Sequence, residues 1–419
     1  MRPALLALML CTASAAAAEL QVIGYLPQWG VYSRGDLIKG LEASGAAARL
    51  NELVYAFAAI GADDRVVFID AQADYLHACT AANSIDGMAD GDGAGSLRGN
   101  FHQLLLLKRR HAGLRVVISI GGWSASERFS GMAGDAGRRK VFVASVSDRL
   151  IAGNLAPGVT APELFDGIDI DWEYPATPRD GVPARAEDSR SFTELLAELR
   201  TELDRQGAAR GRRYVLSAAL PAPTAIAGRL ELGRIHAYLD ALHLMTYDFH
   251  GGWEAITGPL AALHASPNDP AGALQPSVER VVADYRAAGV PAGKLVLGVP
   301  FYGRGWQGVE PGPHGDGHYQ HAGGPAAGAT AAGIDDACVL MARHGATAFR
   351  DPASQAFWTY DAVAKVLWSY DDAVAVRAKR AFALSGGMGG VMCWALTGDD
   401  AQGTLIRALA GGQAAAPTR

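Results

Sequence analysis

Eight apolar stretches recur along the chain, and each is followed by a break that contains polar residues, glycine or proline. They are LQVIGYLP (20–27), LNELVYAFAAI (50–60), LRVVISIGG (114–122), FDGIDIDWE (165–173), YVLSAAL (214–220), ALHLMTYD (241–248), KLVLGVPFYG (294–303) and GGVMCWAL (389–396). Runs this rich in Val, Ile and Leu are typical of parallel strands that are covered on both faces. The pattern therefore predicts a parallel sheet of eight strands.

Amphipathic helix candidates lie between most of these stretches. They occupy residues 101–111, 137–151, 187–206, 277–288 and 376–386, with apolar residues three or four positions apart. Strands that alternate with helices define an α/β protein, and eight such units predict a closed (β/α)8 TIM barrel. An open doubly wound sheet is the alternative. Its dinucleotide-binding form is disfavoured because no GxGxxG follows the first stretch.

Two segments are too long for a bare barrel. Residues 83–100 are rich in Gly, Asp and Ala and predict a surface loop. Residues 305–369 include most of FWTYDAVAKVLWSYDD (357–372), whose aromatic and β-branched residues favour strands. We expect a small α+β insertion domain at 305–369, barrel segments at 19–304 and 370–410, and a disordered tail at 411–419.

Residues 1–18, MRPALLALMLCTASAAAA, have the pattern of a secretory signal peptide: a positive charge, an apolar stretch and a run of small residues. A buried N-terminal helix would leave the alanine run unexplained. A lipid anchor at Cys11 is disfavoured by the bulky Leu10 before it. We therefore expect a secreted protein, extracellular or periplasmic, and no later stretch is long and apolar enough to span a membrane.

Composition excludes several classes of partner. The net charge of -6 and pI near 6.0 provide no basic footprint for nucleic acid or an anionic membrane, so a neutral or weakly polar substrate fits better. Beyond the signal peptide, Cys79, Cys338 and Cys393 lack metal-site spacing, and we expect no metal. Pairing of Cys79 with Cys338 stays open, whereas Cys393 lies in an apolar run and is interpreted as a small buried hydrophobe.

The fourth apolar stretch carries the strongest functional signal. Side chains alternate along a strand, so Asp169, Asp171 and Glu173 share one face. Pro175 ends the strand, which puts Glu173 at the C-terminal mouth of the barrel with the two aspartates below it. Three acids in a poorly hydrated place are costly unless protons are shared or chemistry is done. We expect charge repulsion to raise the pKa of Glu173, which would suit it to protonate a leaving oxygen.

Other residues near this strand have simpler interpretations. Asp166 has the wrong parity for the acidic face, and we expect it at the strand entrance with a local backbone hydrogen bond. Ser119 is predicted to support the buried acids rather than act as a nucleophile. Gly121 and Gly122 indicate a close backbone approach, either to substrate or to a neighbouring strand.

The chain resembles family 18 glycoside hydrolases, the chitinases and their relatives. DGIDIDWE (166–173) matches their DxxDxDxE signature, and SIGGWS (119–124) matches their SxGG motif. Further matches are GYLPQW, YAFA, MTYDFHGGW, YGRGW and CWALTGDD, which occur in the family's order between about residues 21 and 409. The resemblance implies a TIM barrel, and many bacterial members carry an α+β subdomain at the position of the insertion.

The resemblance also implies roles for individual residues. Glu173 matches the catalytic acid/base, Asp171 the residue that holds the substrate's acetamido N–H, and Asp169 its proton-sharing partner. Tyr247 matches the group that hydrogen-bonds the acetamido carbonyl, and Trp394 the floor of the subsite where the bond breaks. Positions that line or support the cleft are matched by Tyr25, Phe57, Gly121, Gly122, Trp123, Tyr174, Met245, Asp248, Tyr302 and Arg304.

Aromatic residues beyond these suit a sugar, because the C–H faces of a pyranose pack on flat rings. Trp29, Trp253 and Trp306 are equally consistent with packing inside the protein. Spacing alone would let Asp171 be the nucleophile of an ordinary retaining glycosidase. The resemblance instead implies substrate assistance, in which the 2-acetamido oxygen attacks the anomeric carbon and Asp171 orients it.

The expected function is therefore a secreted, endo-acting chitinase, a monomer without a cofactor, that binds chitin and N-acetylglucosamine oligosaccharides. An endo-β-N-acetylglucosaminidase acting on glycans or peptidoglycan is an enzymatic alternative. A non-catalytic chitin-binding lectin is the third hypothesis. It is disfavoured because such proteins usually lack the acid that Glu173 supplies here.

Overall fold

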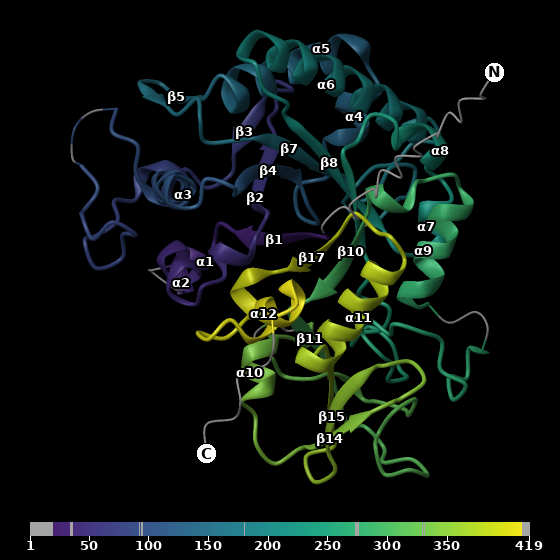
Figure 1. The fold of residues 1–419 in the computed structure, drawn as a ribbon. Coiled ribbons are helices and arrows are strands. Elements are labelled where there is room, and N and C mark those ends of the chain that lie inside the picture. The colour runs from purple at the N-terminus through teal and green to yellow at the C-terminus, as the bar shows by residue number, and fades with distance from the viewer. Residues whose placement is uncertain are drawn as a thin grey trace, which may run out of the picture.

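Eight parallel strands close into a barrel in the computed structural model, which describes residues 20–412 apart from 34–36, 92, 94, 180, 273–275, 329 and 331 (Figure 1). The strands are β1 Gln21–Pro27, β2 Glu52–Ile60, β4 Arg115–Gly121, β7 Gly167–Asp171, β8 Val215–Pro221, β9 Ala241–Met245, β10 Leu295–Pro300 and β17 Gly390–Trp394. Strand β1 pairs with both β2 and β17. This closure confirms the predicted barrel and excludes the open sheet.

Helices surround the barrel, as the alternating pattern predicts (Figure 1). The longer ones are α3 Gly99–Arg110, α5 Ala136–Val146, α6 Asp188–Arg210, α9 Val278–Ala287, α11 Ala373–Ser385 and α12 Thr404–Ala410. Helix α6 buries Phe192, Leu195, Leu199 and Leu203 along one face, since these positions recur every three or four residues. It ends at Gly211, whose left-handed conformation (φ 64°) suits glycine.

Shorter elements connect the barrel units. The helical ones are α1 Gly30–Ser33, α2 Leu37–Ala43, α4 Phe129–Ala133, α7 Thr224–Ala227 and α8 Leu232–Ile235, with the single turns η1 Ala47–Arg49, η2 Gln72–Leu76, η3 Ser147–Ile151, η5 Ala292–Lys294 and η6 Leu396–Gly398. Strand β3 Val66–Phe68 pairs antiparallel with β2, and β5 Asn154–Ala156 pairs with β6 Val159–Thr160. The predicted helix at 137–151 is thus divided into α5 and η3.

An inserted α+β unit follows β10 and contains its own antiparallel sheet. Its elements are β11 Tyr302–Gln307, β12 Gly324–Pro325, β13 Ile334–Asp336, α10 Ala337–Met341, β14 Thr347–Arg350, β15 Phe357–Asp361 and β16 Val366–Tyr370. Trp306 is fully buried with Trp358, Tyr360 and Leu367. It therefore packs inside the insertion, which answers the question that the sequence leaves open for this tryptophan.

The long loop at 83–100 is organised by one carboxylate. Asp90 accepts hydrogen bonds from the backbone N–H of Cys79 at 2.8 Å and of Gly99 at 3.1 Å, and it pairs with His102 at 2.6 Å. Cys79 is a buried free thiol whose pKa burial raises to about 11. The disulfide to Cys338 that the sequence leaves open is therefore not formed.

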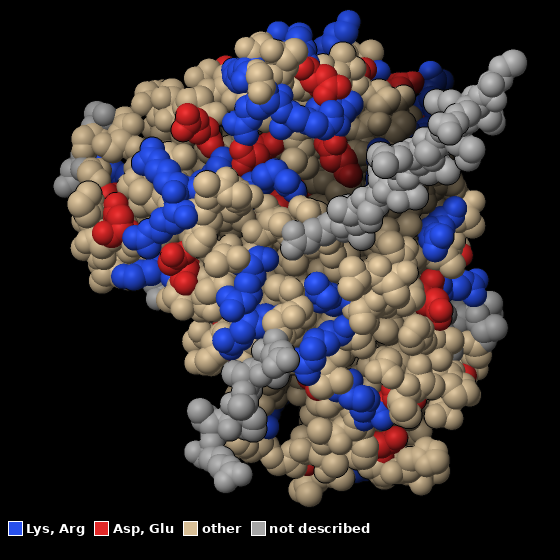
Figure 2. All heavy atoms as spheres, in the orientation of Figure 1, with Lys and Arg blue, Asp and Glu red and all other residues tan. Residues whose placement is uncertain are grey.

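The predicted signal peptide at 1–18 and residues 413–419 of the predicted tail lie outside the described residues. Within the described part of the chain, no helix has the length and apolar character needed to cross a bilayer. Lys and Arg side chains are spread over the visible face among acidic and uncharged residues (Figure 2).

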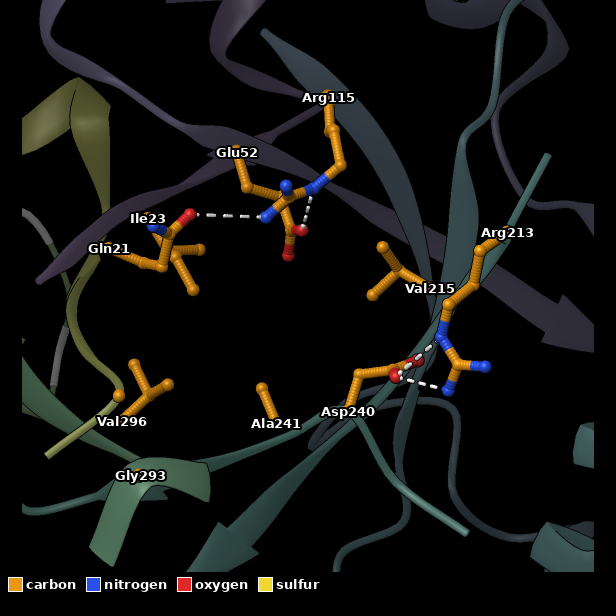
Figure 3. Close-up of a pocket in the computed structure, with 11 residues that line it drawn as sticks. Gln21, Ile23, Glu52, Arg115, Arg213, Val215, Asp240, Ala241, Gly293 and Val296 are labelled. Atoms are coloured by element: carbon orange, nitrogen blue, oxygen red, sulfur yellow. Dashed lines mark hydrogen bonds and ion pairs between the residues drawn. The ribbon is translucent and has the colours of Figure 1, made fainter. Parts of the chain in front are cut away.

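The N-terminal end of the barrel contains a hollow of about 440 Å³ (Figure 3). Its charged lining consists of Glu52, Arg115, Arg213 and Asp240. The acids of the carboxylate strand lie at the opposite end of the barrel, with Asp171 at the C-terminal end of β7 and Glu173 just beyond it. Both ends of the barrel therefore contain carboxylates. The hydrogen-bonding and ionic partners of these carboxylates indicate which end can be catalytic.

Candidate active site

Asp169 and Asp171 of β7 and Glu173, two residues further along the chain, lie in the predicted order toward the mouth. Asp169 is 0% exposed, Asp171 5% and Glu173 8%. Strand β7 ends at Asp171, so Glu173 lies just beyond the last paired residue. A Cβ at Gly121 would lie 2.1 Å from the carbonyl oxygen of Asp171, so only glycine permits this contact between β4 and β7. The close approach predicted for Gly121 is therefore to a neighbouring strand.

Asp169, the deepest acid, is held by hydroxyl groups from three strands. Ser119 and Ser217 each donate to its carboxylate at 2.7 Å, and Tyr25 donates at 3.0 Å. The Tyr25 hydroxyl also lies 2.8 Å from Nδ1 of His243 on β9. Ser119 supports the buried acids, as predicted, and this network fixes Asp169 as an acceptor below Asp171.

Asp171 is a buried carboxyl that pairs with no cation within the part of the chain that the structure describes. Its Oδ1 atom has no hydrogen-bond partner among the described residues. Burial raises the pKa of Asp171 well above its usual value, and the negative charges of Glu173 and Asp169 add to the shift. An acid in this state readily takes up or shares a proton.

Burial raises the pKa of Glu173 to about 7, and the charge of Asp248 adds to the shift. The Tyr174 hydroxyl, which hydrogen-bonds the Glu173 carboxyl, and the Arg179 cation act in the opposite direction. The direction expected from the sequence is confirmed. Repulsion from neighbouring acids is the smaller cause, because removal from water dominates for a side chain buried this deeply.

Ser126, which sequence reasoning missed, joins the strand ends beneath the acid. Its hydroxyl donates to the Gly122 carbonyl at 2.9 Å and accepts the backbone N–H of Glu173 at 2.9 Å. The backbone N–H of Gly122 donates to the Asp171 carbonyl at 2.8 Å. The backbone that carries Glu173 is thus tied to the loop after β4.

An aromatic cluster, formed by Tyr25, Trp29, Phe57 and Trp394, lies beside the acids. The rings of Phe57 and Trp394 are stacked with centroids 5.6 Å apart, and Tyr25 and Trp29 lie 5.7 and 6.4 Å from Trp394. Trp394 ends β17 and remains partly exposed, and Trp29 is exposed. Gly122 approaches Phe57 so closely that a Cβ would lie 2.8 Å from its ring. The cluster offers a flat apolar surface with a partly open face.

A second set of predicted residues meets where β9 and β11 approach each other. Arg304 donates to both oxygens of Asp248 at 2.9 and 2.7 Å, and Tyr302 donates to Asp248 at 2.7 Å. Tyr247 packs edge-on against Tyr302 at 6.0 Å. Met245, at the end of β9, is partly exposed beside them. The guanidinium of Arg304 lies 4.9 Å from the ring centre of Trp253, which is exposed rather than packed inside the protein.

Some functional candidates gave no readable signal in the sequence. Ser126, Ser217, His243 and Arg179 each contact a predicted site residue, but their partners lie between 6 and 218 positions away in the chain. Only the strand alternation of Ser217 and His243 could have placed them inside the barrel. Asp166 accepts the backbone N–H of Val116, on the neighbouring strand, at 2.8 Å. The local bond expected for it is instead one between strands.

A metal site is absent from the described residues, where no group of three His, Cys, Asp or Glu side chains is arranged to hold an ion. What the site offers is a buried acid pair, hydroxyl groups and exposed aromatic rings. Such a combination can bind a sugar and transfer a proton to it. The arrangement defines a candidate glycosidase site.

Comparison with known proteins agrees with this class. The family model for glycosyl hydrolases family 18 matches residues 21–399, and the chain belongs to that family. It is 36% identical to chitinase A1 of Niallia circulans over 92% of this chain and 57% of the relative. It is 33% identical to chitinase C of Streptomyces lividans over 93% of this chain and 59% of that protein. The chain thus spans less than two thirds of the length of these relatives.

Solved structures resemble this chain over nearly its full length. The catalytic domain of psychrophilic chitinase B from Arthrobacter TAD20 matches with a TM-score of 0.86 and 33% identity, over 94% of both chains. A Group IV chitinase of Ostrinia furnacalis, solved in complex with allosamidin, matches with a TM-score of 0.76 and 26% identity over 93% of this chain and 98% of that one.

Proposed function

We propose that the chain is a secreted, endo-acting chitinase that hydrolyses the β-1,4 links between N-acetylglucosamine units. The observation that carries the proposal is the buried pair Asp171 and Glu173 beside the aromatic cluster around Trp394, with no cation paired to Asp171 in the described part of the chain. Relatives and structural neighbours named as chitinases support the choice of substrate. A pyranose ring can stack on Trp394 while its reacting bond meets the acid.

Glu173 is the proposed acid/base. A carboxyl whose pKa is raised to about 7 is largely protonated in weakly acidic solution and remains partly protonated at neutral pH. Its proton passes to the glycosidic oxygen as the bond between that oxygen and the anomeric carbon breaks. In the second half of the reaction the same carboxylate takes a proton from the attacking water. One residue thus serves both steps.

The nucleophile in this proposal is the substrate's own 2-acetamido oxygen. It forms a bond to the anomeric carbon, giving an oxazolinium ion, and water then opens that ion to restore the acetamide. Asp171 accepts the acetamido N–H and stabilises the developing positive charge, while Asp169 shares the proton from below. Tyr247 hydrogen-bonds the acetamido carbonyl from the opposite side. Two inversions at the anomeric carbon leave the product in the β-configuration.

Residues beyond the reacting bond extend the proposed cleft. Trp29, Trp123 and Trp253 are exposed and can each carry a sugar ring, and Arg304 lies over Trp253 at the insertion. The insertion at 305–369 is proposed as one wall of a groove for a long chain. Together with the barrel segments 19–304 and 370–410, it would act as a monomer released by cleavage after residue 18.

The alternative enzymatic function is an endo-β-N-acetylglucosaminidase acting on glycoprotein glycans or peptidoglycan, since that reaction can use the same acids. A chitin-binding lectin would need no acid with a raised pKa, which makes it the weakest of the three. The groove wall formed by the insertion favours a long linear substrate. The exposed tryptophans, spread over separate loops, favour it as well.

The experiment that tests the proposal compares four substrates: a defined hexamer of N-acetylglucosamine, its fully deacetylated form, cellohexaose and a glycoprotein. Internal cleavage of the acetylated hexamer alone, with β-anomeric product seen by NMR immediately after cleavage, is the expected result. Glu173→Gln, with its fold checked by circular dichroism, is the matched inactive control. Cleavage of cellohexaose or the deacetylated hexamer would contradict substrate assistance, and cleavage of the glycoprotein alone would favour the enzymatic alternative.

A further inference from the structure

Arg179 connects the candidate acid to an exposed tryptophan across two loops. It lies between β7 and α6, and its Nε donates to the backbone carbonyl of Glu173 at 2.9 Å. A terminal N–H group of the same guanidinium donates to the backbone carbonyl of Trp123, in the loop after β4. One planar group thus bridges the backbones of two residues that are far apart in the sequence.

The same guanidinium also covers part of the Trp123 ring. Its central carbon lies 3.9 Å from the ring centroid, within range of a cation–π contact. Trp123 is nevertheless 60% exposed, so the rest of the indole remains open to solvent. Arginine is well suited to this double task because its planar fork can donate two hydrogen bonds and stack at once. Lysine could supply the charge but not the geometry.

The charge of Arg179 also acts on the carboxyl of Glu173. This charge lowers the pKa of Glu173, against the raising effects of burial and Asp248. The titratable and charged groups that interact with Glu173 come from several elements and comprise Asp171, Tyr174, Arg179, Tyr247 and Asp248. Within that described set, Arg179 supplies the only positive charge.

We propose that Arg179 is a positioning residue that couples sugar binding on Trp123 to the placement of Glu173. The inference rests on the proposed function and deepens it, because it assigns Trp123 and the acid to one mechanical unit. A sugar that stacks on Trp123 contacts a ring that also packs against the guanidinium of Arg179. The same guanidinium is hydrogen-bonded to the backbone carbonyls of Trp123 and Glu173, so a shift of the ring can move Glu173. Losing the bridge should therefore alter binding and proton transfer together.

Two substitutions separate the geometry from the charge. Arg179→Met keeps an apolar stem but removes both, whereas Arg179→Lys keeps the charge and loses the fork. Both should weaken binding of the N-acetylglucosamine hexamer by about two- to fivefold, the usual worth of an exposed cation–π contact. Binding is measured by calorimetry in the Glu173→Gln background, where the hexamer stays intact. The matched control is Arg190→Met, because Arg190 is an exposed residue of α6 paired with Glu194.

The pH profile supplies a readout that a purely structural role would not change. Glu173 must be protonated to act as acid, and the cation of Arg179 favours its ionised form. Arg179→Met should therefore raise the pH at which kcat/KM declines, by roughly half a unit to one unit. Arg179→Lys keeps the charge, so it should show little of that shift while its hexamer affinity stays as low as that of Arg179→Met. Circular dichroism verifies that each variant is folded.

A double-mutant cycle with Trp123→Ala completes the test. The effects of coupled residues on hexamer affinity are not additive. Arg179→Met should therefore lower hexamer affinity only slightly further in a protein that already carries Trp123→Ala. Additive effects, an unmoved pH profile in Arg179→Met, or equal effects from Arg190→Met would overturn the inference. An inactive wild-type protein would instead reject the proposed function, so the two failures can be told apart.

Discussion

The two ends of the barrel contain the same chemical groups with different partners. At the N-terminal end, Arg115 donates to Glu52 at 3.1 Å, and Arg213 donates to Asp240 at 2.6 Å (Figure 3). At the C-terminal end, Asp171 has an oxygen without a partner among the described residues, and Arg179 contacts the backbone of Glu173 rather than its carboxyl. In the part of the chain that the structure describes, arginines pair with the carboxylates at the N-terminal end, whereas the carboxyls of Asp171 and Glu173 form no ion pair.

A raised pKa alone does not separate the two ends. Burial raises the pKa of Glu52 to about 7 even though Arg115 opposes the shift. Burial also raises the pKa of Glu173 to about 7. What differs is the surroundings, since the mouth adds Asp171 and the exposed rings near Trp394. A titration anomaly identifies a buried acid, and its partners indicate whether that acid is catalytic.

The largest expected effect is on the mouth acid. Glu173→Gln removes the transferable proton while keeping the shape of the side chain, so kcat on chitin should fall by about 100- to 10,000-fold. Hexamer affinity should change little, as measured by calorimetry. A variant that kept more than about a tenth of wild-type turnover would show that Glu173 is not the acid.

The next comparison uses an aspartate from each end. Asp171→Asn should lower kcat by about 100- to 1,000-fold, because an amide cannot supply the charge that stabilises an oxazolinium ion. Asp240→Asn should leave kcat nearly unchanged and lower the free energy of unfolding by about 1–3 kcal/mol, since Arg200 and Arg213 lose a charged partner. Steady-state kinetics and urea unfolding of both variants check this contrast. Equal losses of kcat in Asp171→Asn and Asp240→Asn would contradict the proposed difference between the two ends.

A smaller effect is expected from the insertion. Replacing residues 305–369 by a short Gly/Ser linker should reduce kcat/KM for the hexamer more than for a chromogenic dimer, because only long substrates reach remote subsites. The barrel should survive, since Trp306, Trp358 and Leu367 form a core of their own. Equal losses on both substrates, in a variant that melts cooperatively, would argue against a groove wall.

The last effect concerns stability at the N-terminal end and leaves catalysis unchanged. The pKa of Glu52 is about 7 in the folded chain against 4.5 for the free group, so the folded state binds more protons between these values. Stability contributed by Glu52 is present below pH 4.5 and lost as the pH rises to 7, by roughly 3 kcal/mol. Glu52→Gln should remove this loss. The free energy of unfolding of the variant, relative to that of wild type, should therefore increase between pH 5 and pH 8 when both are measured by urea unfolding. A constant difference across that range would contradict the assignment.

Much of the architecture could be predicted from the sequence because buried parallel strands leave a local signal. Every barrel strand coincides with one of the apolar stretches, and the alternation in β7 places Asp169, Asp171 and Glu173 in the expected order. The inserted sheet was predicted from the length and aromatic content of residues 305–369. These features depend on neighbours within one element.

What escaped prediction depends on contacts between elements. Ser126 and Arg179 are ordinary loop residues until folding brings them to Glu173. The sequence could not separate Trp306, which is buried in the insertion, from Trp29, which is exposed beside Trp394. The cause of the raised pKa of Glu173 was misjudged for the same reason. Burial depends on the whole barrel, whereas charge spacing can be read from one strand.

The most direct test of the central claim is the pH dependence of kcat/KM in wild type and in Glu52→Gln. If Glu173 is the acid, activity on the hexamer should decline as the pH rises through about 7. The decline should be the same in Glu52→Gln, although Glu52 has a pKa in the same range. A wild-type profile that stays flat to pH 9, or a decline that disappears in Glu52→Gln, would contradict the account.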